Sequence, residues 1–285
     1  MKKTFVNGKI VPSKKAVVSV MDRGFLYGDG VFETMRAYGG SVFCLGEHVN
    51  RMLTALKILK IRIPYDKKTL CRLVEKTVRV NRLKDAYVKI VVTRGPAAPG
   101  IDPSAGSVAT VIIFAAPLKA LPRKYYTVGV SVEFPCVRRN EESFTARIKS
   151  LNYLDNILAR HEVRGRGAYE PVFLNSKGNV TETSTANVFI VRGDRVYTPP
   201  PTAGILPGIT REVVMRLAGK YLDNKLIQKD ISKKEFLSAD EIFLTNSIGE
   251  LIPVVKAGGR KIGTGRPGPF FKFLRIVYNI QTGNI

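Results

Sequence analysis

The first 116 residues alternate short strand patterns with helix patterns, which restricts this part of the chain to folds that place helices against a sheet. Residues 31–38 and 41–45 favour two strands that meet at a Gly-Gly turn. Apolar residues recur at helical spacing over 47–59 and again over 67–81. The sequence therefore predicts a mixed α/β fold for the N-terminal part.

Two apolar stretches, 86–93 and 108–116, continue this pattern as strands. The segment 94–107, rich in Gly, Pro and Ser, joins them, and so long a connection between two buried strands favours a functional loop. At the start of the chain, Asn7-Gly8 predicts a hairpin turn between two short strands.

A change in composition near residue 117 predicts a domain boundary. The stretch "PLKALPRKYY" carries two prolines and several basic residues, and a new series of strands follows it. We expect a small N-terminal α/β domain over 1–116, an interdomain linker over 117–124 and a larger domain over 125–285. No internal repeat is visible in either part.

The chain carries a formal charge of +23 and has a sequence pI near 10.1, which raises the question of an anionic partner. Nucleic-acid binding is one alternative, because Lys and Arg neutralise phosphates. The basic residues are spread along the chain, however, and no aromatic-basic RNA-binding motif occurs among them. We therefore favour a basic solvated surface that attracts anionic substrates over a nucleic-acid-binding function.

The cysteines, histidines and apolar runs exclude other classes. Cys44, Cys71 and Cys136 are odd in number and widely spaced, so they indicate neither a disulfide framework nor a zinc site. His48 and His161 are the only histidines in the sequence, and we expect no metal centre. No run approaches the roughly 20 apolar residues of a membrane span, and no signal peptide is recognisable. We expect a cytoplasmic protein without membrane contact.

The stretch "TARIKSLNYLDNILAR" at 145–160 predicts an amphipathic helix that starts next to Lys149. The face that we expect to be buried carries Leu151, Leu154, Ile157 and Leu158. The outward face carries Asp155, Asn156 and Arg160. Because the N-terminal end of a helix repels positive charge, this position would favour a neutral, nucleophilic amine. Lys149 is therefore a candidate catalytic residue.

The remaining candidates fit an anionic cofactor that carries an aldehyde. Motifs typical of zinc proteases, of hydrolases with a nucleophile elbow and of P-loop proteins do not occur. A match to G-x-G-x-x-G at 263–268 lies too near the C-terminal end for a dinucleotide-binding unit. Pyridoxal phosphate needs an amine for a Schiff base, an acid at the ring nitrogen, a donor near the ring oxygen and a phosphate site.

The segment "ARIKSLNYL" resembles the Schiff-base lysine segment of the class-IV, or fold-type IV, pyridoxal-phosphate enzymes. This family includes branched-chain aminotransferases, D-amino-acid aminotransferases and aminodeoxychorismate lyases. "EHVNR" is similar to the family's H-x-x-R, and "TETSTANVF" is similar to its E-x-x-x-x-N-[LIV]-F. The resemblance covers nearly the whole chain. It implies that Lys149 forms the Schiff base, that Arg51 binds the phosphate and that Glu182 faces the pyridine nitrogen.

Two further segments extend the resemblance to the rest of the cofactor site. "GILPGITR" is similar to the segment whose leucine, here Leu206, packs on the ring and whose turn, here Ile209-Thr210, holds the phosphate. "LTNSIGE" supplies Ser247 at a second turn near the phosphate. Thr210 also resembles a helix N-cap, and a helix start favours a phosphate. Tyr153, one helical turn after Lys149, would hydrogen-bond the ring oxygen.

The same resemblance implies a two-domain architecture whose larger domain has a β-barrel-like core, and an assembly of at least a homodimer. It implies transamination in two half-reactions, in which Lys149 moves a proton at the substrate α-carbon. "DRGFLYGDGVFETMR" is similar to the family's N-terminal strand that forms one wall of the substrate pocket. The closest similarity, through the aromatic residues Tyr27, Phe32, Tyr87 and Tyr153 and through "LPGITR", is to branched-chain aminotransferases, which act on L-branched-chain amino acids and 2-oxoglutarate. The substrate-binding residues that it implies are Tyr27, Phe32, Arg36, Tyr87, Lys89, Ser247 and Ile248, with Tyr153 completing an aromatic wall.

Two positions depart from that subgroup. Branched-chain aminotransferases usually have an arginine where this chain has Lys89. A lysine there, with Asn246 before Ser247, is more similar to aminodeoxychorismate lyases. Lysine is a point charge and cannot bind a carboxylate with two parallel hydrogen bonds. Lyase activity and D-amino-acid transfer therefore stay open as alternatives.

Overall fold

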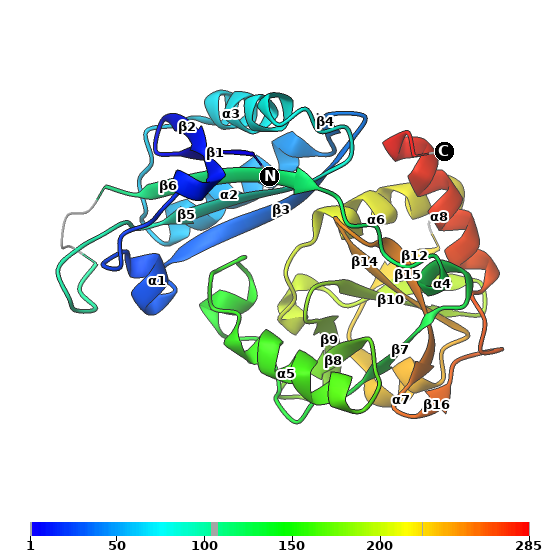
Figure 1. Ribbon diagram of the computed structural model, residues 1–285. Coiled ribbons are helices and arrows are strands. Elements are labelled where there is room, and N and C mark those ends of the chain that lie inside the picture. Colours follow the sequence, from blue (N-terminus) through cyan, green and yellow to red (C-terminus); the bar gives the residue numbers. More distant parts are fainter. Residues whose placement is uncertain (1, 104–107, 224, 285) are drawn as a thin grey trace. The chain divides into compact units, whose positions relative to one another are not determined.

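The computed structural model describes residues 2–103, 108–223 and 225–284 (Figure 1). Its mixture of helices and sheets confirms the expected α/β class. Residues 104–107 of the expected functional loop lie outside the described residues. In the part of the chain that the structure describes, no helix has the length and apolar composition needed to cross a membrane.

The chain divides into two compact units. Met1–Lys119 and Ile148–Asn152 form the N-terminal unit, and Ala120–Arg147 and Tyr153–Ile285 form the C-terminal unit. The first division falls inside the stretch 117–124 that we expected to be a linker. The segment Ile148–Asn152, expected in the larger domain, belongs instead to the N-terminal unit.

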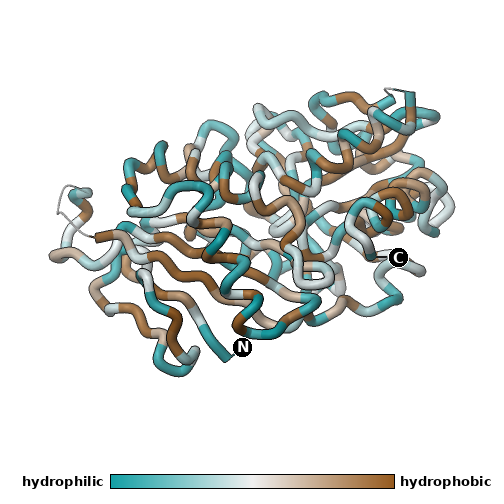
Figure 2. Tube along the Cα trace, turned by 90° about the horizontal axis from the view of Figure 1, so that it is seen from above, coloured by the Kyte–Doolittle hydropathy of each residue, from teal (hydrophilic) through white to brown (hydrophobic). Residues whose placement is uncertain are grey.

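The N-terminal unit is built on a six-stranded antiparallel sheet in the order β2-β1-β6-β5-β3-β4. The strands are Lys3–Val6 (β1), Lys9–Pro12 (β2), Gly30–Tyr38 (β3), Ser41–Val42 (β4), Ala86–Thr93 (β5) and Thr110–Pro117 (β6). Asn7 and Gly8 both have positive φ, which confirms the hairpin turn between β1 and β2. Figure 2 shows long hydrophobic stretches along the tubes near the N-terminus.

Helices α2 (Leu45–Ile58) and α3 (Lys67–Val80) pack on this sheet and confirm the two helices predicted for this region. Their apolar residues meet the inward-facing positions of β3 and β5. The buried core that results includes Met35, Val49, Met52, Leu70, Val74, Val88 and Ile90. A short helix, α1 (Arg23–Tyr27), precedes β3, and a 3-10 turn, η1 (Ser13–Lys15), follows β2.

The C-terminal unit contains a ten-stranded sheet, six strands of which close into a barrel. The barrel follows the order β10-β14-β15-β7-β8-β9, and the pairing of Asn187 with Glu182 closes it between β10 and β9. This closure confirms the β-barrel-like core. The strands are Val130–Glu133 (β7), Glu170–Leu174 (β8), Asn179–Thr183 (β9), Asn187–Arg192 (β10), Arg195–Thr198 (β11), Leu226–Gln228 (β12), Ile231–Ser232 (β13), Glu241–Asn246 (β14), Glu250–Ala257 (β15) and Arg260–Lys261 (β16).

Branched apolar residues from these strands, together with Phe236 of a short helix, form the second core, which includes Val132, Val172, Val188, Leu244 and Ile252. The helices of this unit are Lys124–Thr127 (α4), Leu154–Gly165 (α5), Ile209–Tyr221 (α6), Lys233–Leu237 (α7) and Pro269–Thr282 (α8). Two 3-10 turns lie at Phe144–Ala146 (η2) and Pro201–Ala203 (η3).

Candidate functional site

Lys149 lies on an extended segment that pairs with the edge of β3. The N–H of Phe32 donates to the carbonyl oxygen of Lys149 at 2.9 Å, and the N–H of Leu151 donates to the carbonyl oxygen of Gly30 at 3.0 Å. Strand β4 covers only the far end of β3, at residues 37 and 38. The segment around Lys149 therefore satisfies backbone groups of β3 that a helix at this place would leave unpaired.

The expectation that a helix starts next to Lys149 is wrong. Helix α5 begins at Leu154, and Tyr153 occupies its N-cap position. Lys149 therefore lies outside α5, and the argument from the charge of a helix N-terminus does not apply to it. Tyr153 does not follow Lys149 on one helix face either, so its contact with a cofactor stays a prediction from the resemblance.

The predicted faces of α5 are also wrong. Leu154, Ile157 and Leu158 are 67%, 60% and 57% exposed. Asn156, expected to face outward, is buried because its side-chain amide donates to the carbonyl oxygen of Ser184 at 2.7 Å. Helical spacing thus identified an apolar stripe on α5, but the core of this chain does not cover that stripe.

The amines of Lys149 and Lys89 lie against the same aromatic ring. The Nζ atom of Lys149 is 4.5 Å from the centroid of the Phe32 ring, and the Nζ atom of Lys89 is 4.2 Å from it. Burial lowers the pKa of Lys89, and the positive charge of Lys149 lowers it further. The structure therefore brings the predicted catalytic lysine together with two predicted substrate residues.

Strand register places four of the predicted substrate residues on one face of the N-terminal sheet. Arg36 of β3 lies directly opposite Tyr87 of β5, and Thr34 lies opposite Lys89. Since side chains alternate between the faces of a strand, this half-buried face carries Phe32, Arg36, Tyr87 and Lys89.

The opposite face of β3 carries a buried carboxylate, Glu33, which is 1% exposed. Arg51 of α2 donates to it twice, from Nε at 2.7 Å and from Nη2 at 2.8 Å. The Nδ1 atom of His48, one turn earlier on α2, lies 2.7 Å from the same carboxylate. Arg51, predicted to bind a phosphate, is therefore held by an acid that the sequence analysis did not identify.

Opposing effects set the charges in this cluster. Burial would raise the pKa of Glu33, but the charge of Arg51 and hydrogen bonds from His48 and Arg51 outweigh it and lower the pKa to about 2. Burial lowers the pKa of His48, with Arg51 and Lys149 adding to the effect and Glu33 opposing it. At neutral pH the imidazole is therefore neutral and donates from Nδ1 to an ionised carboxylate.

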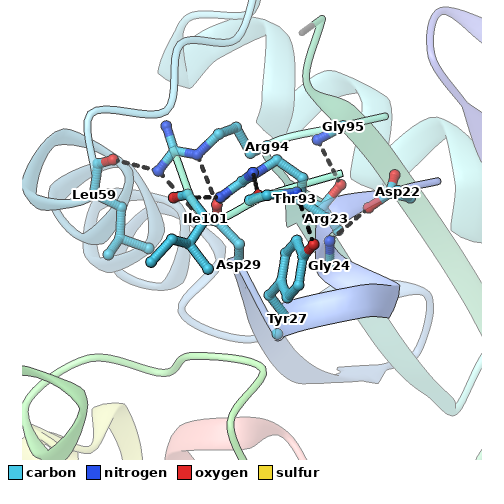
Figure 3. A network of polar contacts seen from close by, with 12 residues as sticks. Asp22, Arg23, Gly24, Tyr27, Asp29, Leu59, Thr93, Arg94, Gly95 and Ile101 are labelled. Atoms are coloured by element: carbon cyan, nitrogen blue, oxygen red, sulfur yellow. Dashed lines mark hydrogen bonds and ion pairs between the residues drawn. The ribbon is translucent and has the colours of Figure 1, made fainter. Parts of the chain in front are cut away.

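Tyr27 is held by a network of polar contacts around Asp29 (Figure 3). The N–H of Gly100 donates to the Tyr27 hydroxyl at 3.1 Å. Arg23 and Arg94 each donate from Nε to Asp29, at 2.9 and 2.7 Å. Burial would raise the pKa of Asp29, but hydrogen bonds from Arg94 and Arg23 and their charges lower it. The ionised carboxylate therefore ties the region of Tyr27 to the end of β5.

In the C-terminal unit, Glu182 accepts hydrogen bonds from three donors. The N–H of Leu206 and the side-chain amide of Asn187 each lie 3.1 Å from its Oε2 atom, and Arg139 lies 3.4 Å from its Oε1 atom. The guanidinium of Arg139 also covers the ring of Phe173, 4.6 Å from its centroid. These donors fix the Glu182 carboxylate at one end of the barrel.

Asn187 links Glu182 to two other predicted parts of the cofactor site. Across the β10–β14 pair it lies opposite Thr245, which leads into the turn that carries Ser247 and Ile248. Its side-chain amide also donates to the carbonyl oxygen of Leu206 at 2.9 Å. The structure therefore brings Glu182, Leu206 and the turn after β14 to the same end of the barrel.

Helix α6 begins at this end with Gly208 as its N-cap, which corrects the prediction that Thr210 is the cap. Glycine has no side chain, and no side-chain hydrogen bond caps the helix among the described residues. Ile209 and Thr210 are the first two helical residues, so their N–H groups belong to the uncapped first turn. A Cβ atom at Gly208 would meet the side-chain oxygen of Asn187.

The turn after β14 offers a further polar group. The side chain of Asn246 accepts the N–H groups of Ile248, at 3.0 Å, and of Gly249, at 2.6 Å, and this shapes the backbone around Ser247. The buried hydroxyl of Thr245 has no hydrogen-bond partner among the described residues. A fixed carboxylate, an uncapped helix start and an unpaired hydroxyl fit a cofactor with a basic ring nitrogen and a phosphate.

Glu33, His48 and Arg139 were not predicted as site residues, although His48 is the histidine of the H-x-x-R motif. A signal existed for Glu33, because it shares its strand face with apolar Val31 and Met35. In the described part of the chain, no group of three or more His, Cys, Asp or Glu side chains could hold a metal ion.

Comparison with known proteins gives one consistent family. The family model described as amino-transferase class IV matches residues 30–257. A Methanocaldococcus jannaschii protein provisionally named a branched-chain-amino-acid aminotransferase is 39% identical over 96% of this chain and 94% of its own length. The Bacillus subtilis aminodeoxychorismate lyase is 34% identical over 99% of this chain and 95% of its own length. A Bacillus licheniformis D-alanine aminotransferase is 32% identical over 98% and 95%, respectively.

Solved structures agree with the sequence relatives. The Escherichia coli branched-chain amino acid aminotransferase superposes with a TM-score of 0.95 at 30% identity, covering 99% of this chain and 95% of that one. The T.th. branched-chain amino acid aminotransferase, solved with pyridoxamine 5'-phosphate, gives a TM-score of 0.94 at 30% identity and the same coverage.

Proposed function

Because this chain belongs to the class IV aminotransferase family, whose members depend on pyridoxal phosphate, we propose that it transfers amino groups between L-branched-chain amino acids and 2-oxoglutarate. The observation that carries the proposal is the pair of amines at Phe32. Lys149 offers the amine that the family's chemistry needs, and Lys89 offers a second cation on a face that also carries aromatic residues.

The residues proposed to hold the cofactor differ in their tasks. Lys149 would bond its aldehyde, and Glu182, held by the donors described above, would pair with the protonated ring nitrogen. Leu206 would contact the ring and Tyr153 would bind the ring oxygen. The phosphate contacts are proposed for Arg51, Ile209, Thr210 and Ser247. When bound, pyridoxal phosphate supplies a ring that accepts electrons from the substrate α-carbon.

The chain's own residues then carry out the proton transfers and the selection of substrate. We propose that the Nζ atom of Lys149 would take the proton from the substrate α-carbon and pass it on to the cofactor, and would move a proton in the opposite direction in the reverse half-reaction. The residues proposed to contact substrates are Tyr27, Phe32, Arg36, Tyr87, Lys89, Ser247 and Ile248. Aromatic rings cover an aliphatic side chain, and Lys89 attracts the distal carboxylate of 2-oxoglutarate.

Aminodeoxychorismate cleavage is the second candidate, and Lys89 together with Asn246 favours it. The Bacillus subtilis lyase is 34% identical to this chain, against 39% for the Methanocaldococcus jannaschii relative. D-amino-acid transfer is the third candidate, supported by the Bacillus licheniformis relative at 32% identity. All three candidates require the same lysine, so the substrate assay decides among them.

We also propose that the protein works as a homodimer or a higher homo-oligomer. The exposed apolar stripe on α5, formed by Leu154, Ile157 and Leu158, supports this. An apolar stripe on a helix is normally buried against the protein core or against a partner molecule. Light scattering coupled to size-exclusion chromatography measures the mass directly. A mass of about 31.5 kDa, that of one chain, would overturn the oligomer.

The test of function is a substrate panel with the purified holoenzyme. We expect leucine, isoleucine and valine to react with 2-oxoglutarate at similar rates. Alanine should react at least roughly tenfold more slowly, since each methylene in an apolar pocket contributes about 1–3 kcal/mol. A preference for D-alanine, or release of pyruvate from aminodeoxychorismate without transfer to 2-oxoglutarate, would replace the proposal with one of its alternatives.

A second experiment tests the cofactor assignment separately. Borohydride reduction of the holoenzyme followed by peptide mass spectrometry should place a phosphopyridoxyl group on Lys149. A label on another lysine would refute the assignment of the catalytic residue whatever the substrate.

A further inference from the structure

The buried cluster of Glu33, His48 and Arg51 is costly for a fold, and its geometry suggests why the chain contains it. Glu33 shares its face of β3 with the apolar core, where an ionised carboxylate is strongly unfavourable unless charged or polar partners surround it. Those partners both come from α2, at positions three residues apart, which a helix presents on the same side. A purely apolar residue at position 33 would remove the need for either.

The pairing of Glu33 with Arg51 fixes the direction of the guanidinium. Two hydrogen bonds, of 2.7 and 2.8 Å, run from Nε and Nη2 to the two carboxylate oxygens, so the planar group can neither rotate nor slide. His48 binds the Oε2 atom, which also accepts the Nη2 hydrogen bond, and so prevents the carboxylate from turning. Neutral His48 adds this restraint without adding a charge that would compete with Arg51.

Arg51 is the most exposed residue of the cluster and is therefore the one that can contact a ligand. The side chains of Glu33 and His48 are 1% and 3% exposed, whereas that of Arg51 is 17% exposed. The acid and the imidazole are therefore enclosed by the core, and the guanidinium lies at its border. The backbone of Lys149 pairs with that of Phe32, the neighbour of Glu33 on β3, so the cluster lies one residue along the strand from the segment that carries the proposed catalytic amine.

We propose that Glu33 and His48 are positioning residues that hold Arg51 in the orientation in which it binds the phosphate of the cofactor. The inference rests on the proposed function, because the cofactor phosphate is the ligand that Arg51 is proposed to bind. It predicts that the cluster contributes to recognition of the phosphate and contributes nothing to recognition of the pyridine ring.

The test compares two ligands that differ only in the phosphate. Apoprotein is titrated with pyridoxal phosphate and with pyridoxal. The quantity compared is the dissociation constant for pyridoxal divided by that for pyridoxal phosphate, measured for wild type, Glu33→Gln, His48→Gln and Arg51→Gln. We expect Glu33→Gln to reduce this ratio roughly tenfold or more, as for loss of a charge-assisted hydrogen bond, with pyridoxal binding almost unchanged. His48→Gln should change the ratio in the same direction and by less.

A double variant separates positioning from general damage to the fold. If Glu33 acts through Arg51, then Glu33→Gln combined with Arg51→Gln should bind pyridoxal phosphate no more weakly than Arg51→Gln alone. Additive losses in the double variant, or an equal loss for both ligands in Glu33→Gln, would overturn the inference. Should Glu33→Gln fail to fold, His48→Gln combined with Arg51→Gln gives the same comparison.

Asp29→Asn is the matched control, because Asp29 is a carboxylate of the same unit that pairs with two other arginines, Arg23 and Arg94. It should leave the ratio of dissociation constants unchanged. The outcomes also distinguish the two proposals. If Arg51→Gln itself leaves the ratio unchanged, the phosphate assignment of Arg51 fails. If Arg51→Gln lowers the ratio and Glu33→Gln does not, only the positioning inference fails.

Discussion

Lys89 and Lys149 lie against one aromatic ring, with their Nζ atoms 4.2 and 4.5 Å from the centroid of Phe32. Both amines are attracted to the negative face of the ring, while their like charges repel each other. One amine is part of β5 and the other is part of a segment paired with β3. Two cations beside a half-buried sheet face form a place where an anionic group binds readily.

Replacing Lys89 should separate the two substrates of the proposed reaction. In Lys89→Met, we expect kcat/KM for 2-oxoglutarate to fall roughly tenfold while that for leucine changes by less than about twofold, because only the dicarboxylate needs the second cation. Steady-state kinetics with each substrate varied in turn measures both values. Lys76→Met, an exposed lysine on α3, is the control and should change neither. Equal losses for both substrates would contradict a role in acceptor binding.

The same lysine predicts a pH dependence. Since burial and the charge of Lys149 lower the pKa of Lys89, it loses its positive charge at a lower pH than an ordinary lysine, whose pKa is about 10.5. The KM for 2-oxoglutarate should therefore rise as the pH increases, in a step that lies below pH 10.5. The KM for leucine should show no such step. The Lys89→Met variant should lose the step. A step of equal size in that variant would assign it to another group.

Glu182→Gln tests the acid proposed for the ring nitrogen. The amide keeps the shape of the side chain but not its charge, so we expect the first half-reaction to slow at least about 100-fold, which is roughly 2.7 kcal/mol of barrier. Single-turnover mixing with leucine measures this rate, and borohydride labelling of Lys149 should still succeed. Glu142→Gln, at an exposed position, serves as control. An unchanged half-reaction would mean that the acid is another residue.

Gly208→Ala tests the approach of α6 to Asn187. The backbone at Gly208 has φ of −74°, which alanine adopts freely, so the effect would come from the collision of the new methyl with the Asn187 side-chain oxygen. We expect a loss of about 1–3 kcal/mol in the free energy of unfolding and weaker binding of pyridoxal phosphate. Denaturant unfolding and cofactor titration measure the two effects.

Gly165→Ala is the control for this substitution. A methyl at Gly165, the last residue of α5, meets no atom within 4 Å, and it should leave stability unchanged or raise it by about 0.4–1 kcal/mol. If Gly208→Ala behaves like Gly165→Ala, then the contact with Asn187 does not limit the start of α6.

The family and the barrel-like core could be predicted from sequence motifs. The motifs also identified residues that the structure brings together, such as Glu182 and Leu206. These residues carry chemistry, and their identity and spacing can be recognised without knowledge of the packing. The alternating pattern of residues 31–38 likewise predicted a strand, which β3 confirms, because a period of two follows from the geometry of any strand.

The errors concern features that depend on distant parts of the chain. The pattern after Lys149 has a helical period, but whether its apolar stripe faces a core is set by what packs against it. Asn156 is buried because Ser184, far away in sequence, accepts its amide hydrogen bond. The extended pairing of Lys149 with Phe32 involves backbone groups alone, which leave no signature in the side chains. Glu33 lies between apolar residues in the sequence, but its partners His48 and Arg51 lie on α2, 15 and 18 residues away, and only the fold brings them to it.

The antiparallel pairing of Lys149 with β3 has a consequence for any attempt to separate the two units. The chain passes between the units at three places, after Lys119, Arg147 and Asn152. A fragment ending at Lys119 would lack the partners of Gly30 and Phe32, and its open strand edge could pair with strands of other molecules, which leads to aggregation. A soluble N-terminal fragment would therefore need residues 148–152 to be supplied as a peptide or grafted through a new loop.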